Sequence, residues 1–512
     1  MRRVHLDTLL CSDAQLVVCE APAGCGKTYQ GARLGAIVAG ELSRGRVLVL
    51  THTNAAANEF RARLRVQRSR CLVRTLDSLV VDIATAYRIP LGLPGDVSQW
   101  AIERSGGDDS GFVDLAKHVA DFLESAPIVS SALVERFPFV IADEHQDANE
   151  HQERVLKAMK ASGGRLRVFG DPMQAIYREA GDSSMSGPLA RWERLKTEGE
   201  VCELSVPHRW QGSGSDLGEW IMYARNALKA GRAVDIGRGL PSSVHVIQAD
   251  TRDAGHGKFI PDQEAGGQIR RALREAPQSL VLAPSNELVR SLRGSVARTH
   301  RIWEGASRPA LDKFVAGLVR DSGDPQSVGD HWVEFMCAVA AGFTRSRHGK
   351  VFRDILEEKC ERSRRGMPGQ LREAAKEIQV RPDHSGAARA LKRVLSLIAS
   401  GEKGFDAIRV DYWSEVADAK RVGASTDLAE AMRQVRMDRR YCDPGLPDRA
   451  ISTIHRAKGR EGPNVMLIPC GSAQFRPTQY KRNQLYVALS RATRSLTLVV
   501  PVNGPTQLLS GL

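Results

Sequence analysis

The chain has 512 residues, a formal net charge of +13 and a hydrophobic content of 42%. This length predicts two or more domains, and the balance of apolar and charged residues excludes a disordered or fibrous protein. The sequence has no apolar run long enough to cross a membrane, so we expect no membrane partner. The positive charge favours a polyanionic partner, above all nucleic acid; a basic surface that only maintains solubility is the alternative.

The nine cysteines are scattered along the chain, and none forms a Cys-x-x-Cys pair. This spacing predicts reduced thiols and argues against a zinc site or an iron–sulfur cluster. The N-terminal residues do not form an apolar leader. Together these features predict a cytoplasmic protein.

The first informative stretch runs from Leu16 to Thr28 and reads LVVCEAPAGCGKT. Its apolar beginning predicts a buried parallel strand, and a turn of small residues then leads into an expected helix. This order is typical of a P-loop, in which backbone N–H groups surround phosphate oxygens, Lys27 reaches the β- and γ-phosphates and Thr28 holds Mg²⁺. The residues expected around the phosphates are Ala21, Pro22, Ala23, Gly24, Cys25, Gly26, Lys27 and Thr28. A glycine-rich turn without a ligand is the alternative.

A second apolar strand, predicted at Phe139–Asp143, ends in two adjacent acids, Asp143 and Glu144. Beside a P-loop, Asp143 would hold the Mg²⁺ shell and Glu144 would orient and deprotonate the attacking water. Adjacent acids are otherwise usually solvated surface groups. The buried strand before them favours the catalytic interpretation.

Three further strand ends carry polar side chains that suit phosphate chemistry. Thr53 and Asn54 can donate to a phosphate backbone or simply cap a helix. The amide of Gln174 can bond a γ-phosphate, whereas Arg209 alone would be an ordinary surface arginine. The strands before these residues are predicted at Arg46–Leu50, Leu166–Gly170 and Val201–Leu204.

The second half of the chain continues the α/β pattern around a long helical stretch. Residues 302 to 443 are mostly helical and strongly charged, and each of their basic clusters is most simply a solvated helix face. Strands are predicted at Val244–Ile247, Leu280–Ala283, Val465–Ile468 and Leu496–Val500, with a helix at Gln484–Ala492.

Seven motifs, in this order, resemble those of the superfamily 1A helicases of the UvrD, Rep and PcrA type. They read APAGCGKT, THTNAAANEF, VIADEHQD, FGDPMQAIY, PHRW, TIHRAKGREG and YVALSRA, and they extend over most of the chain. The resemblance implies an α/β fold of two RecA-like P-loop lobes. Each lobe would be a parallel sheet flanked by helices with an inserted, mainly helical subdomain, and the chain would be a short form of the family.

The domain boundaries that this resemblance implies divide the chain into four parts. Lobe 1A, with the P-loop and the paired acids, would comprise residues 1–82 and 135–205, and a small insertion 1B would comprise residues 83–134. Lobe 2A would comprise residues 206–301 and 444–512, and a basic helical insertion 2B would comprise residues 302–443.

The resemblance also implies roles for individual residues in ATP hydrolysis with Mg²⁺. The residues expected to be catalytic are Glu144, Gln174, Arg209 and Arg491. The two arginines, both from the second lobe, would neutralise charge in the transition state. Tyr29 and His208 would lie on the two faces of the base. The expected nucleotide contacts outside the P-loop are Tyr29, His208, Gly459 and Glu461, and the expected nucleic-acid contacts are His52, Thr53, Asn54, Tyr177, Thr453 and His455.

The sequence departs from the family on the nucleic-acid side. His52 replaces a stacking phenylalanine, Glu179 stands where the family has a stacking tryptophan, and Gly462 replaces an aromatic residue. A base stack is worth about 1–3 kcal/mol, so these losses predict poor strand separation. Trp192 and Trp210 are candidates for a substitute stack, with burial in the core as the alternative.

The resemblance therefore implies an ATP-dependent helicase or translocase on single-stranded or partly duplex DNA, with 3′-to-5′ polarity. The short architecture also resembles the helicase-like subunit of Gabija-type antiphage systems, which works with an OLD-type nuclease. That likeness leaves open a nucleic-acid-activated NTPase in a defence complex, with weak unwinding of its own. The sequence assigns no oligomeric state.

Overall fold

The computed structural model describes residues 2–104, 110–177, 186–212, 215–237, 239–250, 258–304, 308–441 and 445–511. The chain forms two compact units. The first comprises Met1–His300 and Leu446–Leu512, and the second comprises Arg301–Gly445.

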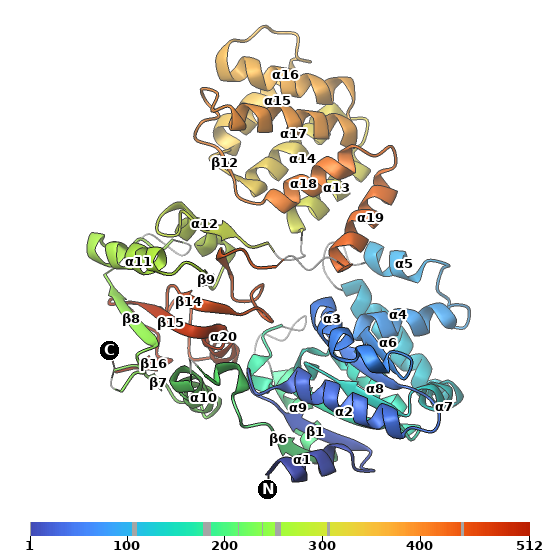
Figure 1. Cartoon of the computed structure of the whole chain (residues 1–512). Coiled ribbons are helices and arrows are strands. Elements are labelled where there is room, and N and C mark those ends of the chain that lie inside the picture. Colours follow the sequence, from blue (N-terminus) through green and yellow to red (C-terminus); the bar gives the residue numbers. More distant parts are fainter. Residues whose placement is uncertain are drawn as a thin grey trace. The chain divides into compact units, whose positions relative to one another are not determined.

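The first unit contains a six-stranded parallel sheet in the order β3-β2-β4-β5-β1-β6. Its neighbouring strands β1 and β6 are labelled in Figure 1. Its strands are β1 (Leu16–Glu20), β2 (Val47–Thr51), β3 (Cys71–Thr75), β4 (Phe139–Ala142), β5 (Arg165–Gly170) and β6 (Glu200–Glu203). β1, β2 and β4 are buried along their whole length, as expected for parallel strands covered on both faces. Because the strands are parallel, the carboxyl ends of β1, β4 and β5 meet at one edge, where open α/β sheets bind ligands.

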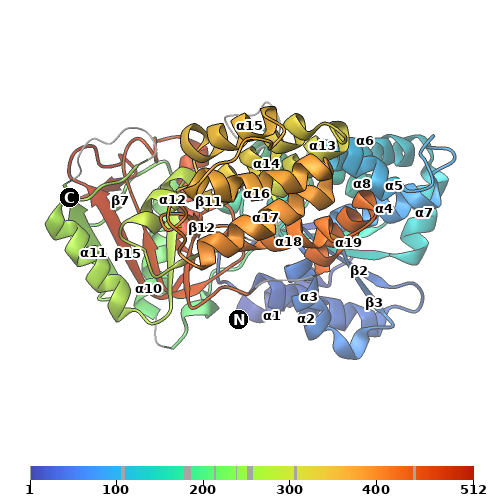
Figure 2. The same ribbon diagram turned by 90° about the horizontal axis from the view of Figure 1, so that it is seen from above.

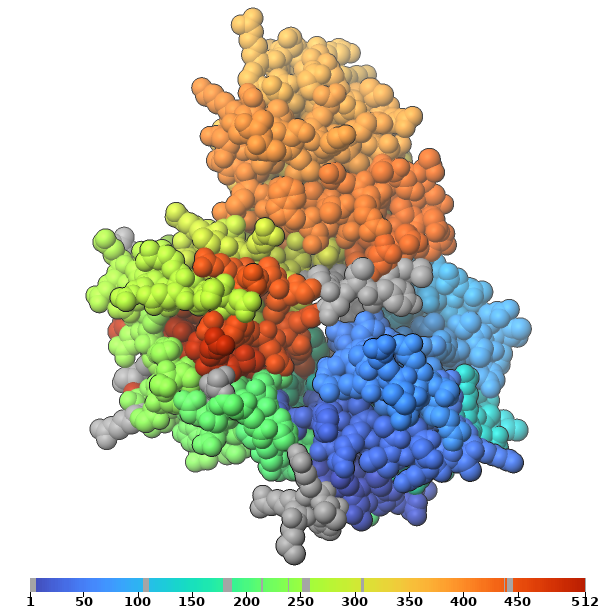
Figure 3. Space-filling view, in the orientation of Figure 1, coloured from blue at the N-terminus to red at the C-terminus, as the bar shows by residue number. Residues whose placement is uncertain are grey.

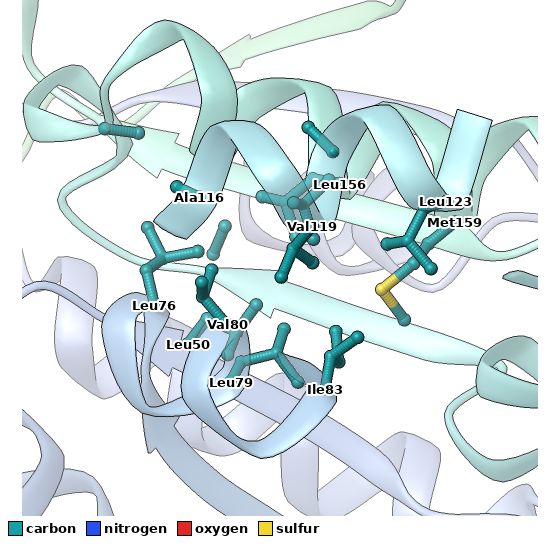
Figure 4. Packing of buried hydrophobic residues seen from close by; sticks show 14 of the residues in the cluster. Leu50, Leu76, Leu79, Val80, Ile83, Ala116, Val119, Leu123, Leu156 and Met159 are labelled. Carbon is teal, nitrogen blue, oxygen red and sulfur yellow. The ribbon is translucent and has the colours of Figure 1, made fainter. Parts of the chain in front are cut away.

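Helices cover both faces of this sheet. They are α1 (Arg2–Leu10), α2 (Lys27–Glu41), α3 (Asn54–Arg63), α4 (Leu76–Ala86), α5 (Val97–Arg104), α6 (Ser110–Ser125), α7 (Pro127–Arg136), α8 (Glu150–Ala161) and α9 (Ser186–Glu198). On one face, Leu50 of β2 shares a core with Val80 of α4, Val119 of α6 and Leu156 of α8 (Figure 4). The helices of the predicted insertion 83–134 thus pack into the same core as the sheet.

A second parallel sheet in the first unit has the order β13-β9-β14-β15-β8. Its elements are α10 (Ser215–Lys229), β8 (Val244–Ala249), α11 (Gln263–Glu275), β9 (Ser279–Ala283), α12 (Asn286–Gly294), β13 (Arg449–Thr453), β14 (Gly462–Leu467), α20 (Gln479–Leu489) and β15 (Ala492–Pro501). α11 packs on β8, and α10 and α20 pack on β15 (Figure 1). Figure 2 shows α10 and α11 close to β15 in a second view. A short pair, β7 (Val234–Asp235) and β16 (Leu509–Ser510), lies beside them.

Two segments that are far apart in the sequence therefore build this second sheet. β8 and β9 precede the helical unit, whereas β13, β14 and β15 follow it, and β9 lies between β13 and β14. Figure 3 shows the residues near the C-terminus, in red, packed among the green residues that follow position 206.

The second unit is helical. Its elements are β10 (Arg301–Ile302), α13 (Pro309–Arg320), α14 (Pro325–Val339), β11 (Ala340–Ala341), α15 (Lys350–Glu357), α16 (Gly366–Val380), α17 (His384–Ala399), β12 (Arg409–Val410), α18 (Trp413–Gly423) and α19 (Leu428–Tyr441). Its core contains Trp332, which is fully buried and stacks on Phe352 with the ring centroids 4.5 Å apart. α16 and α17 are close neighbours in this unit.

The structure confirms the predicted α/β class, with large parallel sheets flanked by helices. The predicted helix Gln484–Ala492 needs a correction at both ends. α20 begins earlier, at Gln479, and ends at Leu489. Ala492 is already the first residue of β15, where it pairs with Gly462 of β14. Among the residues that the structure describes, no helix is long and apolar enough to cross a membrane.

Candidate nucleotide-binding site

The predicted P-loop lies between β1 and α2, at the carboxyl edge of the first sheet. Gly24 and Gly26 adopt left-handed backbone angles, with φ of 74° and 82°. A Cβ atom on Gly24 would lie 2.6 Å from the Trp210 ring, so only glycine fits there. α2 begins at Lys27, which places Lys27 and Thr28 in the first helical turn, where free backbone N–H groups attract anions.

The predicted catalytic acid contacts the P-loop lysine directly. Lys27 Nζ lies 2.6 Å from Glu144 Oε1, and Gln146 Nε2 donates to Glu144 Oε2 over 2.5 Å. Burial acts to raise the pKa of Glu144, but the charges of Lys27 and Lys458 and these hydrogen bonds lower it below its usual range. Glu144 also has a left-handed backbone with φ of 52°, which is strained for a residue with a side chain. An ionised carboxylate is thus held at the phosphate-binding end of the site.

The neighbouring acid has the opposite electrostatic character. Asp143 is 2% exposed, and its Oδ1 atom has no hydrogen-bond partner. Burial and the charge of Glu144 raise the pKa of Asp143, although Lys27 opposes the shift. A buried, unpartnered carboxylate oxygen that feels the charge of Lys27 fits a hard cation such as Mg²⁺.

Within the described part of the chain, no three His, Cys, Asp or Glu residues are grouped as a metal site. Mg²⁺ is usually held by one or two carboxylates together with water and substrate phosphates. Asp143 and the Thr28 hydroxyl are the protein groups that would hold it.

The predicted γ-phosphate sensor meets one of the predicted arginines. Gln174 lies in a short turn after β5; its Nε2 donates to Asp171 Oδ2 over 3.1 Å and its Oε1 accepts from Arg491 Nη2 at 3.4 Å. Arg491 is 2% exposed, and burial lowers its pKa to about 10. Arg209 forms an ion pair with Glu461 and donates to the Ser490 carbonyl over 2.8 Å.

The residues expected around the base and ribose are the more exposed ones. Tyr29 is 56% exposed, and His208 is exposed with its Nδ1 at 3.0 Å from Gln211 Oε1. A Cβ atom on Gly26 would lie 3.3 Å from the His208 ring, so this ring lies against the P-loop. Gly459 takes a left-handed φ of 78°, just before the segment that carries Glu461.

Three of the six residues expected to contact nucleic acid form hydrogen bonds within the protein. The Thr53 hydroxyl accepts from the Ala56 N–H, which makes Thr53 the N-cap of α3, and the buried Thr453 hydroxyl accepts from the Arg456 N–H. His455 Nε2 lies 2.6 Å from Tyr480 Oη. The assignment of Thr53, Thr453 and His455 to nucleic acid therefore stays a prediction.

His52 and Tyr177 differ from one another in exposure. His52 Nε2 is buried without a partner, and burial, His145 and Lys458 lower the pKa of His52 to about 3. Tyr177 is 48% exposed, and Lys458 Nζ lies 4.8 Å from its ring centroid. Asn54 is the first residue of α3.

The two candidate substitute stacks are core residues. Trp192 and Trp210 are 2% and 1% exposed, and Trp210 Nε1 donates to the Ala492 carbonyl over 2.7 Å. Glu179 lies outside the described residues, and Gly462 is the first residue of β14.

The sequence of this chain resembles those of known helicases. The family described as UvrD/REP helicase N-terminal domain matches residues 101–181, and the UvrD-like helicase C-terminal domain matches residues 449–499. DNA helicase II of Haemophilus influenzae is 20% identical over 93% of this chain and 81% of its own length. The chain is therefore similar to UvrD/Rep-like helicases over most of its length.

Other relatives match a shorter part of the chain. An ATP-dependent helicase/nuclease subunit from Streptococcus pneumoniae strain Hungary19A-6 is 29% identical over 27% of this chain, and its counterpart from Streptococcus sanguinis is 29% identical over the same share. The matched region spans 10% of the length of these relatives.

The structure also shows site residues that sequence reasoning did not single out in this UvrD/Rep-like chain. Lys458 Nζ contacts both carboxylate oxygens of Asp147, at 2.6 and 2.5 Å, and the Gln174 carbonyl at 2.6 Å. Tyr486 Oη accepts from the Ala23 N–H over 2.9 Å. Asp147 and Lys458 lie within the motifs VIADEHQD and TIHRAKGREG, so the sequence could have indicated a role for them. Tyr486 lies inside the buried helix α20, where a tyrosine by itself indicates no function.

Proposed function

We propose that this chain is an ATP-dependent helicase or translocase that acts on single-stranded or partly duplex DNA. The observation that carries the proposal is the set of polar contacts that join the two sheets at the nucleotide site. Lys27 and Glu144 come from the first sheet, Arg491 comes from the second, and Gln174 contacts Arg491 directly. Such a site can respond to a bound γ-phosphate from both sides.

The ion pair between Lys27 and Glu144 suggests how hydrolysis begins. Bound Mg²⁺·ATP would supply phosphate oxygens as new partners for Lys27. Glu144, which is ionised, is then free to accept a proton from the attacking water, while Gln146 keeps its orientation. Arg491 and Arg209 would stabilise the charge that develops on the transferred phosphoryl group.

Three finer features of the proposal rest on the family resemblance. They are the 3′-to-5′ polarity, the alternate grip of the two lobes on the strand, and a cytoplasmic location. The relative named DNA helicase II supports DNA as the nucleic acid. Thr53, Thr453 and His455 bond to other groups of the protein, which supports the prediction that the isolated chain separates strands poorly at physiological salt.

The proposal is tested by ATP hydrolysis of the purified chain with and without a single-stranded oligonucleotide. We expect Mg²⁺-dependent turnover that the oligonucleotide stimulates at low salt, with the stimulation fading steeply as salt rises. Lys27→Ala should abolish turnover because it removes the charge that the β- and γ-phosphates need. Turnover that Lys27→Ala leaves intact would contradict the proposal.

A second candidate is an NTPase component that works with a partner nuclease in an antiphage complex. The names of the two streptococcal relatives join helicase and nuclease, which supports the partner nuclease, whereas the antiphage role rests on the resemblance. We would purify the chain from its native cell and assay DNA cleavage by the recovered complex. Nucleic-acid-dependent cleavage that needs Lys27 would support this candidate, whereas efficient unwinding of long duplexes by the chain alone would favour the free helicase.

A further inference from the structure

A buried charged cluster lies directly beneath the P-loop and the sensor turn. It consists of Glu20 at the end of β1, Asp171 just after β5, and Arg225 on α10. They are 4%, 0% and 1% exposed, respectively. β1 and β5 are adjacent in the sheet, with Glu20 opposite Gly170, so the two acids lie side by side. None of the three belongs to the residues assigned to nucleotide chemistry above.

Arg225 joins the two acids. Its Nη2 atom lies 2.5 Å from Glu20 Oε1 and 2.9 Å from Asp171 Oδ1, and its Nε lies 3.2 Å from the same Asp171 oxygen. Burial acts to raise the pKa of Glu20, but Lys229 and Arg225 lower it, so Glu20 is held ionised. Lys229 also pairs with Glu20, from a side chain that is 41% exposed.

Stability alone is a weak explanation for this cluster. Burying charges is costly, and a buried ion pair is often no more stabilising than apolar residues of the same volume. Such a pair does fix the orientation of the carboxylates, because a guanidinium is planar and binds carboxylates with a defined geometry. The contacts of Asp171 show that the oriented group is the side chain of Gln174.

Asp171 connects Arg225 to Gln174, the predicted γ-phosphate sensor. Its Oδ1 accepts from the Met173 N–H, and its Oδ2 accepts from Gln174 Nε2. With that end of the amide held, Gln174 Oε1 faces Arg491. A continuous series of polar contacts thus runs from Arg225 through Asp171 and Gln174 to Arg491.

The same guanidinium also reaches the start of the P-loop. Glu20 directly precedes Ala21, and Ala23 two residues later donates its N–H to Tyr486 of α20. The guanidinium of Arg225 therefore connects the end of β1, which leads into the P-loop, to the turn that carries Gln174.

We propose that Arg225 is a positioning residue for nucleotide hydrolysis, acting through Asp171 on the amide of Gln174. The inference rests on the proposed ATP hydrolysis. Without Arg225, Asp171 loses its buried cation and the Gln174 amide is no longer held for the γ-phosphate and Arg491. The loss would slow the chemical step and would change ATP binding little.

The test is a double-mutant cycle in steady-state ATP hydrolysis, with Arg225→Met alone and in a Gln174→Ala background. We expect Arg225→Met to lower kcat about tenfold with a small change in KM, a loss of the size seen for coupled neighbours. In the Gln174→Ala background the same substitution should change kcat less than about threefold, since the group it positions is gone.

Lys229→Met is the matched control, because it removes a cation from the same helix and the same partner, Glu20, at a more exposed position. It should leave kcat within about threefold of wild type. Arg225→Lys keeps the buried charge and serves if Arg225→Met does not fold; it should lower kcat severalfold, again only when Gln174 is present.

A fall in kcat that is equally large in both backgrounds, or equally large in Lys229→Met, would overturn the positioning role. Wild-type chain without ATP hydrolysis would overturn the proposed function and this inference together. Wild-type hydrolysis with additive losses would overturn this inference alone.

Discussion

The nucleotide side and the nucleic-acid side of the first unit are built differently. On the nucleotide side, the charged groups contact other polar groups of the site. Lys27 forms an ion pair with Glu144, and Arg491 donates a hydrogen bond to Gln174. On the nucleic-acid side, the expected contact residues are helix caps such as Thr53, exposed rings such as Tyr177, or half-buried rings such as His52.

This difference indicates that the fold specifies nucleotide binding more closely than nucleic-acid binding. Phosphate and Mg²⁺ need a small number of charged groups within hydrogen-bond reach, and the parallel sheet supplies these from neighbouring strand ends. A single strand instead needs stacking rings and diffuse positive charge, which surface residues can provide in many arrangements. We therefore expect substitutions on the nucleotide side to affect catalysis strongly and those on the other side to affect coupling.

Among substitutions on the nucleotide side, Arg491→Ala should cause one of the largest losses of ATP turnover. An arginine that acts on the transition state is worth about 10³-fold or more in turnover, so kcat should fall by about that factor while ATP affinity changes little. Arg494→Ala, at an exposed position on β15, is the matched control. A binding defect with unchanged kcat would place Arg491 outside the catalytic site.

The contact between the two sides is tested by Lys458, which joins Asp147 and Gln174 and lies over the Tyr177 ring. We expect Lys458→Met to lower the stimulation of ATP hydrolysis by single-stranded DNA about tenfold, with a smaller change in the unstimulated rate. Lys160→Met, which removes a surface ion pair with Glu198, should leave the stimulation unchanged.

A pH series checks the same contact without a substitution. Burial raises the pKa of Asp147 to about 6, although Lys458 opposes the shift. The ion pair needs the ionised carboxylate, so it is complete above this pKa and is lost as the pH falls through about 6. Stimulation by DNA should fall over the same range in wild type, and stimulation that is flat from pH 7 to pH 5 would contradict the role of Asp147.

The smallest effect is expected at the base. Tyr29 and His208 are exposed planar side chains, and stacking on them accepts any base. We predict that ATP and GTP are hydrolysed with kcat/KM values within about tenfold of one another. A strong preference for ATP that survives Tyr29→Ala combined with His208→Ala would show that another group reads adenine.

Local sequence patterns predicted much of the nucleotide side. The strands before the P-loop and before Asp143 are short, mostly apolar runs, and the strand before Gln174 is buried from Leu166 to Gly170 although it contains Arg167. The polar residues that follow these strands are the groups that meet at the sheet edge. The end of α20 was placed too late, because Ala492 is apolar in either a helix or a strand and only its pairing with Gly462 decides.

The contacts between distant segments could not be predicted in this way. Arg225 and Glu20 are 205 positions apart, and neither has a sequence signature for a buried ion pair. Tyr486 meets Ala23 across 463 positions, and only the folded arrangement of α20 against the P-loop brings them together. Such pairs follow from tertiary packing, which no local pattern encodes.

The central claim, that Glu144 is the base of an ATP-hydrolysing site, is tested most directly by Glu144→Gln. The amide keeps the size of the side chain but cannot take a proton, so hydrolysis should fall by roughly two to four decades. Binding of Mg²⁺·ATP, measured by titration with a fluorescent analogue, should persist. A Glu144→Gln protein that hydrolyses ATP at the wild-type rate would contradict the account.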